Sequence, residues 1–201
     1  MRGKQLNLFG VEAAAPRPAD LAGLLAGPGQ VVRMGGTARV SVVVDTLWRA
    51  RTLHAELAER GIGATLVATV DDHIAVRSAY TTVLAPLGAA WLRGAVKLPP
   101  PGFWLDGRRL RLWVLAAGHA DALGFTLRLA PPVGAAARAG DDPAWVPVGM
   151  ALAAAGLPGV LLGTRAGGPA YRIVGRRRIG RLAELVGDRP LGVPDEGWPT
   201  S

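Results

Sequence analysis

Side chains that could perform acid-base or metal chemistry are few and scattered in this sequence of 201 residues. The histidines, His54, His73 and His119, are widely separated and lack the short spacing of metal ligands. Asp71 and Asp72 precede His73 directly, but between two expected strands this triplet is more typical of a polar turn. The absence of cysteine excludes disulfide frameworks, thiolate metal sites and a cysteine nucleophile. The sequence therefore indicates no catalytic constellation and no cofactor.

The basic side chains are almost all arginine, because only Lys4 and Lys97 are lysines among 23 Lys and Arg, and the formal net charge is +8. A sequence pI near 11.3 is compatible with a polyanion partner. Guanidinium forks match phosphate oxygens, and counterion release favours such binding. The Ala, Gly and Pro content also suggests GC-rich codons that favour Arg, so a solvated basic surface is the alternative.

Residues 5–9, QLNLF, resemble the bacterial sliding-clamp-binding motif, a linear element of the form Gln-Leu-polar-Leu-Phe. The resemblance implies that Gln5, Leu6, Leu8 and Phe9 bind the clamp, with the last two filling apolar subpockets. The Ala/Pro-rich stretch that follows is typical of a flexible or extended linker, from which the peptide could reach a clamp. The alternative is an N-terminal strand or staple that packs on the folded domain.

Hydrophobic periodicity predicts the elements of the first half. Residues 38–44 alternate as a strand, with Arg39, Ser41 and Val43 opposite three other valines. Asp45 is expected to cap a helix over 46–60, which ends at Gly61. That helix is expected to bury one stripe of side chains, formed by Leu47, Ala50, Leu53, Leu57 and Ala58. Residues 32–37 predict a hairpin turn, and strands at 63–70 and 73–79 precede a helix that begins near Tyr80.

The second half repeats this order. We expect a strand at 124–130, a helix over 141–156, strands at 159–164 and 170–175, and a helix over 176–187. Residues 61–77 and 156–172 have equal length and share Gly, Thr, Ala and Arg at equivalent places. The sequence therefore predicts an internal duplication of a β-α-β-β-α unit.

The start of each unit resembles the LAGLIDADG family over about residues 20–190. The matching residues are Leu21, Ala22, Gly23, Leu24 and Gly29 in LAGLLAGPG, and Ala117, Gly118, Asp121, Ala122 and Gly124 in AAGHADALG. The resemblance implies an α+β fold with a LAGLIDADG-like helix before each β-α-β-β-α repeat, a pseudo-twofold and an antiparallel sheet saddle. Small residues let two such helices approach closely. Two ordinary packed helices in an α+β domain are the alternative.

This resemblance predicts the domain organisation. We expect a tail at 1–19, a first repeat at 20–94, a linker at 95–109, a second repeat at 110–190 and a C-terminal tail at 191–201. Two stretches of the second half are RLWVLAAGHADALGFTLRLA and AAAGLPGVLLGTRAGGPAYRIVGRRRIGRLAELVG. Their layout is similar to that of the N-terminal domain of WhiA-type regulators. The last residues, DRPLGVPDEGWPTS, leave no room for the helix-turn-helix of those regulators, which argues against promoter-specific control.

The motif resemblance also bears on DNA cleavage. In nucleolytic members, an acidic residue just before the terminal Gly of each motif helps to bind a divalent cation. The corresponding residues are Pro28 and Leu123, which cannot ligate a metal, and Asp121 is expected to cap or hydrogen-bond locally. We therefore expect no nuclease activity and no bound metal.

The family's saddle straddles duplex DNA, and strand alternation predicts which arginines face it. From the strands these are Arg39, Arg77, Arg128 and Arg172, with Arg33 contributed by the first hairpin. Arg176, Arg177, Arg178 and Arg181 at the start of the final helix could contact phosphates. A solvated helix face near Glu184 and Asp188 is the alternative for this last group.

These features together favour a noncatalytic factor that binds double-stranded DNA and is recruited to the bacterial sliding clamp, in replication, repair or their regulation. The alternatives are a degenerate or divergent LAGLIDADG nuclease, and a transcriptional regulator or protein adaptor that binds no DNA. The longest apolar region, residues 149–163, is short and interrupted by Gly and Pro, so no membrane segment is expected. We expect a cytoplasmic, nucleoid-associated monomer.

Overall fold

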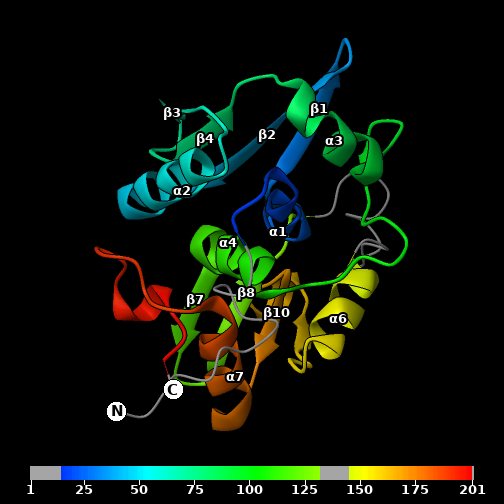
Figure 1. Ribbon diagram of the computed structural model, residues 1–201. Coiled ribbons are helices and arrows are strands. Elements are labelled where there is room, and N and C mark those ends of the chain that lie inside the picture. Colours follow the sequence, from blue (N-terminus) through cyan, green and yellow to red (C-terminus); the bar gives the residue numbers. More distant parts are fainter. Residues whose placement is uncertain (1–14, 132–144, 201) are drawn as a thin grey trace.

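The computed structural model describes residues 15–131 and 145–200 (Figure 1). The clamp-like motif at residues 5–9 lies outside the described residues. So do residues 141–144, the beginning of the helix expected over 141–156. Among the described residues, no helix is long and apolar enough to cross a membrane.

The first half contains a short helical segment, a strand pair, a helix, a second strand pair and a final helix. These elements are η2 (Pro18–Leu21), α1 (Ala22–Ala26), β1 (Gln30–Met34), β2 (Thr37–Val44), α2 (Leu47–Glu59), β3 (Ala64–Ala68), β4 (Ile74–Ser78), η3 (Thr82–Leu84) and α3 (Ala85–Trp91). A two-stranded ribbon of β5 (Leu92–Arg93) and β6 (Val96–Lys97) follows, so the expected linker at 95–109 includes a strand.

The second half has the same order of elements. It contains α4 (Gly107–Ala117), β7 (Gly118–Asp121), β8 (Gly124–Arg128), α6 (Trp145–Ala154), β9 (Val160–Leu162), η4 (Thr164–Ala166), β10 (Ala170–Ile173), α7 (Arg176–Val186) and η5 (Asp195–Gly197). Each half forms an antiparallel four-stranded sheet, in the order β1-β2-β4-β3 and β7-β8-β10-β9. The predicted duplication and the α+β class are confirmed.

Helices α1 and α4 pack against each other at the centre, between the two sheets (Figure 1). The contact is close because Gly23 has no side chain: a Cβ there would lie 1.9 Å from the carbonyl oxygen of Arg109. Helices α2 and α3 cover one face of the first sheet. In the second sheet, α6 packs against Tyr171 of β10, whose hydroxyl donates to the Trp145 carbonyl over 2.9 Å. Each sheet therefore has one helix-covered face that belongs to a common core.

Alternation in the sheets follows the predicted period of two. Val40, Val42 and Val44 are buried while Val43 on the same strand is 52% exposed. The hairpin at 32–37 turns through Gly35 and Gly36, both of which have positive φ angles that suit glycine. The hairpin between β3 and β4 turns at Asp71 and Asp72, as expected.

Some local predictions are wrong. The N-cap of α2 is Thr46, whereas Asp45 forms a 3.3 Å ion pair with Arg49 on the first turn. Leu47 and Ala58 of the expected apolar stripe are exposed. The buried face of α2 includes Arg49 and Glu56 instead. By contrast, the helix expected near Tyr80 is confirmed: its helical segment begins at Thr82, with the Thr81 hydroxyl accepting from Val83 N over 3.3 Å.

The largest difference concerns the second motif. Residues 118–121, which were expected in the motif helix, form β7 and pair with β8. His119 therefore lies on a strand instead of a helix. The helix ends at Ala117 because the following residues find hydrogen-bond partners in the sheet, a tertiary effect that helix-favouring alanines do not reveal.

The chain after α7 packs against the core. Trp198 is buried, and its ring lies 5.2 Å from the guanidinium of Arg111. Gly197 packs against the Trp48 ring, where a Cβ would lie 2.7 Å from the nearest ring atom. Residues near the C-terminus therefore contribute to the structure that holds α2 and α4 together.

Candidate nucleic-acid interface

The strand registers define which side chains share the helix-free face of each sheet. We call these two faces together the saddle face. Ser41 of β2 pairs with Gln30 of β1 and Arg77 of β4, and it alternates with the buried valines. In the second sheet, Thr126 of β8 pairs with His119 of β7 and Arg172 of β10. Paired residues point to the same face, so Ser41 and Thr126 mark equivalent centres of the saddle face.

Four of the predicted arginines lie on the saddle face, two in each sheet: Arg39, Arg77, Arg128 and Arg172. Their chain neighbours, such as Val76 beside Arg77 and Leu127 beside Arg128, are buried. The predicted strand alternation, which places these arginines on the face opposite their buried chain neighbours, is confirmed. Arg77 and Arg172 pair with Ser41 and Thr126, so the two halves present one arginine each at equivalent positions.

Two of these arginines are held by neighbours. The Arg39 guanidinium lies 4.7 Å from the centre of the Tyr80 ring, in a cation-π contact. Arg172 donates to Asp121 Oδ2 over 2.9 Å. The Nε atoms of both arginines are buried without an acceptor among the described residues. The same part of the chain provides no hydrogen-bond or ion-pair partner for the Arg77 and Arg128 side chains.

Asp121 makes the local hydrogen bond that the sequence led us to expect. Its Oδ1 accepts from the backbone N–H of Leu123 over 2.7 Å, at the turn between β7 and β8. This hydrogen bond and the nearby Arg172 guanidinium lower the pKa of Asp121. The residue stays ionised at neutral pH, so it holds Arg172 and opposes polyanion binding at the same time.

Arg33 does not belong to the saddle face. It pairs with Ala38, whose side chain is fully buried under the helices, and its side chain packs against Gly88 of α3. The Gly35–Gly36 turn pairs Met34 with Thr37, and this register turns Arg33 to the helix-covered face. The structure therefore separates Arg33 from the strand arginines with which it was grouped.

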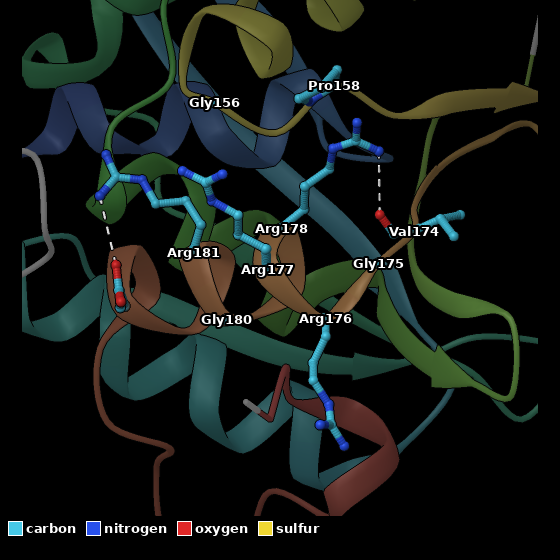
Figure 2. A pocket seen from close by; sticks show the side chains of 10 residues that line it. Gly156, Pro158, Val174, Gly175, Arg176, Arg177, Arg178, Gly180 and Arg181 are labelled. Carbon is cyan, nitrogen blue, oxygen red and sulfur yellow. Dashed lines mark hydrogen bonds and ion pairs between the residues drawn. The ribbon is translucent and has the colours of Figure 1, made fainter.

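The arginines of α7 form a different cluster. Arg176, Arg177, Arg178 and Arg181 line a hollow of about 980 Å³ beside Gly156 and Pro158 (Figure 2). Arg181 pairs with Glu184 at 3.7 Å, and Arg178 donates to the Val174 carbonyl over 3.3 Å. In Figure 2, Arg176 points away from the other three. Helix α7 packs against α4 in the core, so this cluster and the saddle face belong to different layers.

The same registers correct the alignment of the second motif. Ser41 and Thr126 are equivalent, so their strand partners Gln30 and His119 are equivalent as well. The residues that precede these partners, Gly29 and Gly118, are therefore the terminal glycines of the two motifs. The residue before each terminal glycine is therefore Pro28 in the first half and Ala117 in the second. Leu123 was the wrong equivalent, because it lies 64% exposed in the turn between β7 and β8.

The ends of the two motif helices are bound by cationic side chains from elsewhere in the chain. Lys97 Nζ donates to the carbonyls of Gly27 and Gly29 over 2.9 and 2.6 Å. Arg49 donates to the carbonyls of Leu115 and Gly118 over 2.9 and 2.6 Å. Burial lowers the pKa of Arg49, against the opposing effect of Asp45. Sequence reasoning missed both contacts, which join residues far apart in the chain.

The residues at these helix ends do not fit a divalent cation. Pro28 and Ala117 offer no carboxylate, and the equivalent carbonyls of Gly29 and Gly118 already accept hydrogen bonds from a cation. Positive charge close to those oxygens repels a metal ion. Within residues 15–131 and 145–200, no group of three or more His, Cys, Asp or Glu side chains is arranged to hold a metal.

Comparison with known proteins identifies the fold. No family model matches the chain, and no curated protein matches it. Among solved structures, it is similar to the homing endonuclease I-WcaI bound to its DNA recognition sequence, with a TM-score of 0.59, 10% identity and coverage of 86% of this chain and 81% of that one. A structure of I-DmoI in complex with DNA and Mn gives a TM-score of 0.46 and 15% identity, over 86% and 97% of the two chains. The chain has the fold of LAGLIDADG homing endonucleases.

Proposed function

We propose that this protein is a noncatalytic factor that binds double-stranded DNA on its saddle face and is recruited to the bacterial sliding clamp by residues 5–9. The observation that carries the proposal is the placement of four arginines on the helix-free faces of both sheets. The fold is one that I-WcaI uses when bound to its DNA recognition sequence. Replication, repair or their regulation is the cellular role that this combination fits.

The charge of the saddle face favours modest, sequence-tolerant binding. The strands contribute four arginines and one carboxylate, Asp121, which is engaged by Arg172. Exposed apolar side chains, among them Val32, Met34 and Val43, share this face with the arginines. A face of this kind contacts phosphates through arginine and sugars or base edges through apolar atoms. Tethering to a clamp would raise the local concentration of such a weak binder near DNA.

Absence of cleavage is supported by the chemistry at the ends of the motif helices. Pro28 and Ala117 replace the acidic residues that the family resemblance implies, and Lys97 and Arg49 bind the adjacent carbonyls. We expect the purified protein to leave supercoiled and linear duplex DNA intact with Mg²⁺ or Mn²⁺. Metal-dependent cleavage that Asp121→Ala abolishes would contradict this part of the proposal and favour a divergent nuclease.

Recruitment is tested with purified clamp. The full chain should bind it, and the triple variant Gln5→Ala, Leu8→Ala, Phe9→Ala should lose at least about tenfold in affinity, because these side chains supply the pocket contacts. An Asn7→Ala variant is the matched control, since Asn7 is the residue of the motif expected to stay solvated. Equal binding by the wild type and the triple variant would contradict recruitment through residues 5–9.

The α7 cluster can be tested separately from the saddle face. If Arg176, Arg177 and Arg178 also contact phosphates, changing all three to Gln should weaken duplex binding and reduce its salt dependence. Unchanged binding would assign these side chains to a solvated helix surface. The two sets of arginines lie in different layers, so their effects should be additive.

A further inference from the structure

An apolar groove lies where the described chain begins. Its volume is about 540 Å³, and it is formed by η2, α3 and the segment before α4. Its walls include Val83, Leu87, Phe103 and Trp104, and its two charged members are Arg17 and Arg109. No carboxylate lines it. The volume falls within the range of roughly 300–1,000 Å³ typical of pockets that hold apolar ligands.

Contacts among its own side chains hold the walls of the groove, which are incompletely covered. The Trp91 and Phe103 rings meet edge to face at 5.1 Å, and the Arg109 guanidinium lies 3.9 Å from the centre of the Trp104 ring. Arg109 is fixed in turn by a 3.1 Å ion pair with Asp106. Even so, Trp104 is 58% exposed and Val83 is 55% exposed. Trp104 is a large apolar side chain that is held in place yet faces water, and with the exposed Val83 it indicates a surface for a binding partner.

We propose that residues 5–9 of the same chain occupy this groove, with Leu8 and Phe9 against Val83 and Trp104, and that clamp binding requires their release. The groove begins at Arg17 and Pro18, so the segment that carries Leu8 and Phe9 joins the domain at the groove's edge. Between Phe9 and Arg17 the chain can span up to about 26 Å when extended, which is enough to fold back along the groove.

The tether makes even a weak contact effective. A short linker provides an effective concentration of about 1 mM, so a contact with a Kd of about 0.1 mM would be formed about nine tenths of the time. Under that condition only about one tenth of the molecules present a free motif. The apparent affinity for a clamp is then about tenfold weaker than that of the released motif. The competition between the groove and a clamp rests on the proposed clamp binding, whereas occupancy of the groove by residues 5–9 does not.

Photo-crosslinking of the full chain tests the occupancy. With p-benzoylphenylalanine in place of Phe9, we expect an intramolecular crosslink to residues 83–91 or 98–104. The groove variant Val83→Asp, Trp104→Asp should reduce its yield at least about fivefold. The control variant Val70→Asp, Leu191→Asp should not, because these two apolar residues are fully exposed outside the groove. If the aspartate groove variant fails to fold, serine at the same two positions replaces it.

Crosslinks elsewhere on the domain, crosslinks between two copies, or no crosslink would each overturn the proposal. Clamp affinity separates this proposal from recruitment. If both hold, the groove variant binds clamp up to about tenfold tighter than the wild type and the control variant. If the groove crosslink forms but no variant binds clamp, recruitment fails and groove occupancy stands. If the groove variant and the wild type bind clamp equally and the crosslink is missing, only groove occupancy fails.

Discussion

Glu56 is the residue at which the two halves of the chain share a buried charge. Its carboxylate accepts from Arg60 over 2.7 Å and from Arg111 of α4 over 2.6 Å. Arg60 also donates to Asp20 Oδ2 over 3.1 Å, and its side chain is fully buried. Arg111 also donates hydrogen bonds to the carbonyls of Val186 and Asp188. Two carboxylates, Glu56 and Asp20, therefore balance the guanidinium groups of Arg60 and Arg111, and these contacts hold η2, α2 and α4 together.

Replacement of Glu56 by alanine should be strongly destabilising. The change leaves Arg111 without a carboxylate partner and Arg60 with Asp20 alone, and breaking such a buried charge pair costs up to about 3–5 kcal/mol in the free energy of unfolding. Glu59→Ala, at an exposed position of the same helix, should change it by less than about 0.5 kcal/mol. Urea denaturation of the three proteins measures both values. Similar stability of the two variants would contradict the role assigned to Glu56.

Replacement of Asp121 by asparagine should strengthen DNA binding. The change removes the negative charge from the saddle face and releases Arg172 from its 2.9 Å ion pair. We expect the Kd for a duplex to fall by about two- to fivefold at about 0.1 M salt, the scale of one partly exposed charge pair. Titration of a labelled duplex measures it, with Asp72→Asn in the β3–β4 turn as the control. An unchanged or weaker affinity would show that Arg172 does not contact DNA.

Single residues were predicted from the sequence where one strand pattern decides their direction. Arg39 and Arg128 follow from alternation with buried neighbours. Arg33 also had a usable signal, because a two-residue Gly-Gly turn pairs it with Ala38 and not with a saddle residue. The contacts of Lys97 and Arg49 had no such signal in the sequence. Lys97 lies 68 residues from Gly29, and Arg49 lies 69 residues from Gly118, whose carbonyls they bind.

At the scale of elements, the close packing of α1 on α4 sets the distance between the two sheets. Gly23 allows that packing, because any side chain there meets the Arg109 backbone. Helix α4 also contacts α2 of the first half and α7 of the second half, so it fixes the two halves relative to each other. The small residues of the motif are therefore used for helix contact.

Gly23→Ala should separate the two motif helices. Its Cβ would lie 1.9 Å from the Arg109 carbonyl oxygen, and backbone atoms on both sides must move. We expect a loss of about 1–3 kcal/mol or more in the free energy of unfolding. Gly63→Ala is the matched control, because a Cβ at Gly63 meets no atom within 4 Å. Thermal and urea denaturation measure both, and equal stability of the two variants would contradict close helix packing at Gly23.

Elements were predictable where local pattern and tertiary pairing agree. The four strands with clear apolar patterns, β2, β4, β8 and β10, lie where the sequence predicted them. Strand β7 could not be recognised, because Ala116, Ala117 and Gly118 continue a helix-like composition into a four-residue strand. It forms a strand because it pairs with β8. The sequence alignment assumed a longer motif helix, and it therefore placed Leu123 at the position of the acidic residue.

At the scale of the whole molecule, two antiparallel sheets with matched registers present Arg77 and Arg172 at equivalent positions. The duplication and the family resemblance predicted this arrangement. The relation between the saddle face and the α7 cluster was not predictable, because both are arginine-rich in sequence and only the layering separates them. The apolar groove likewise depends on segments that are distant in sequence.

The most direct test of DNA binding on the saddle face is its salt dependence. The affinity of the full chain for a plain duplex is measured between about 50 and 200 mM salt, beside a variant with Arg39, Arg77, Arg128 and Arg172 changed to Gln. If the four arginines contact phosphates, the variant should bind more weakly, and the slope of log K against log salt should become shallower by about 3–4. Equal affinities and equal slopes for the two proteins would contradict DNA binding by the saddle face.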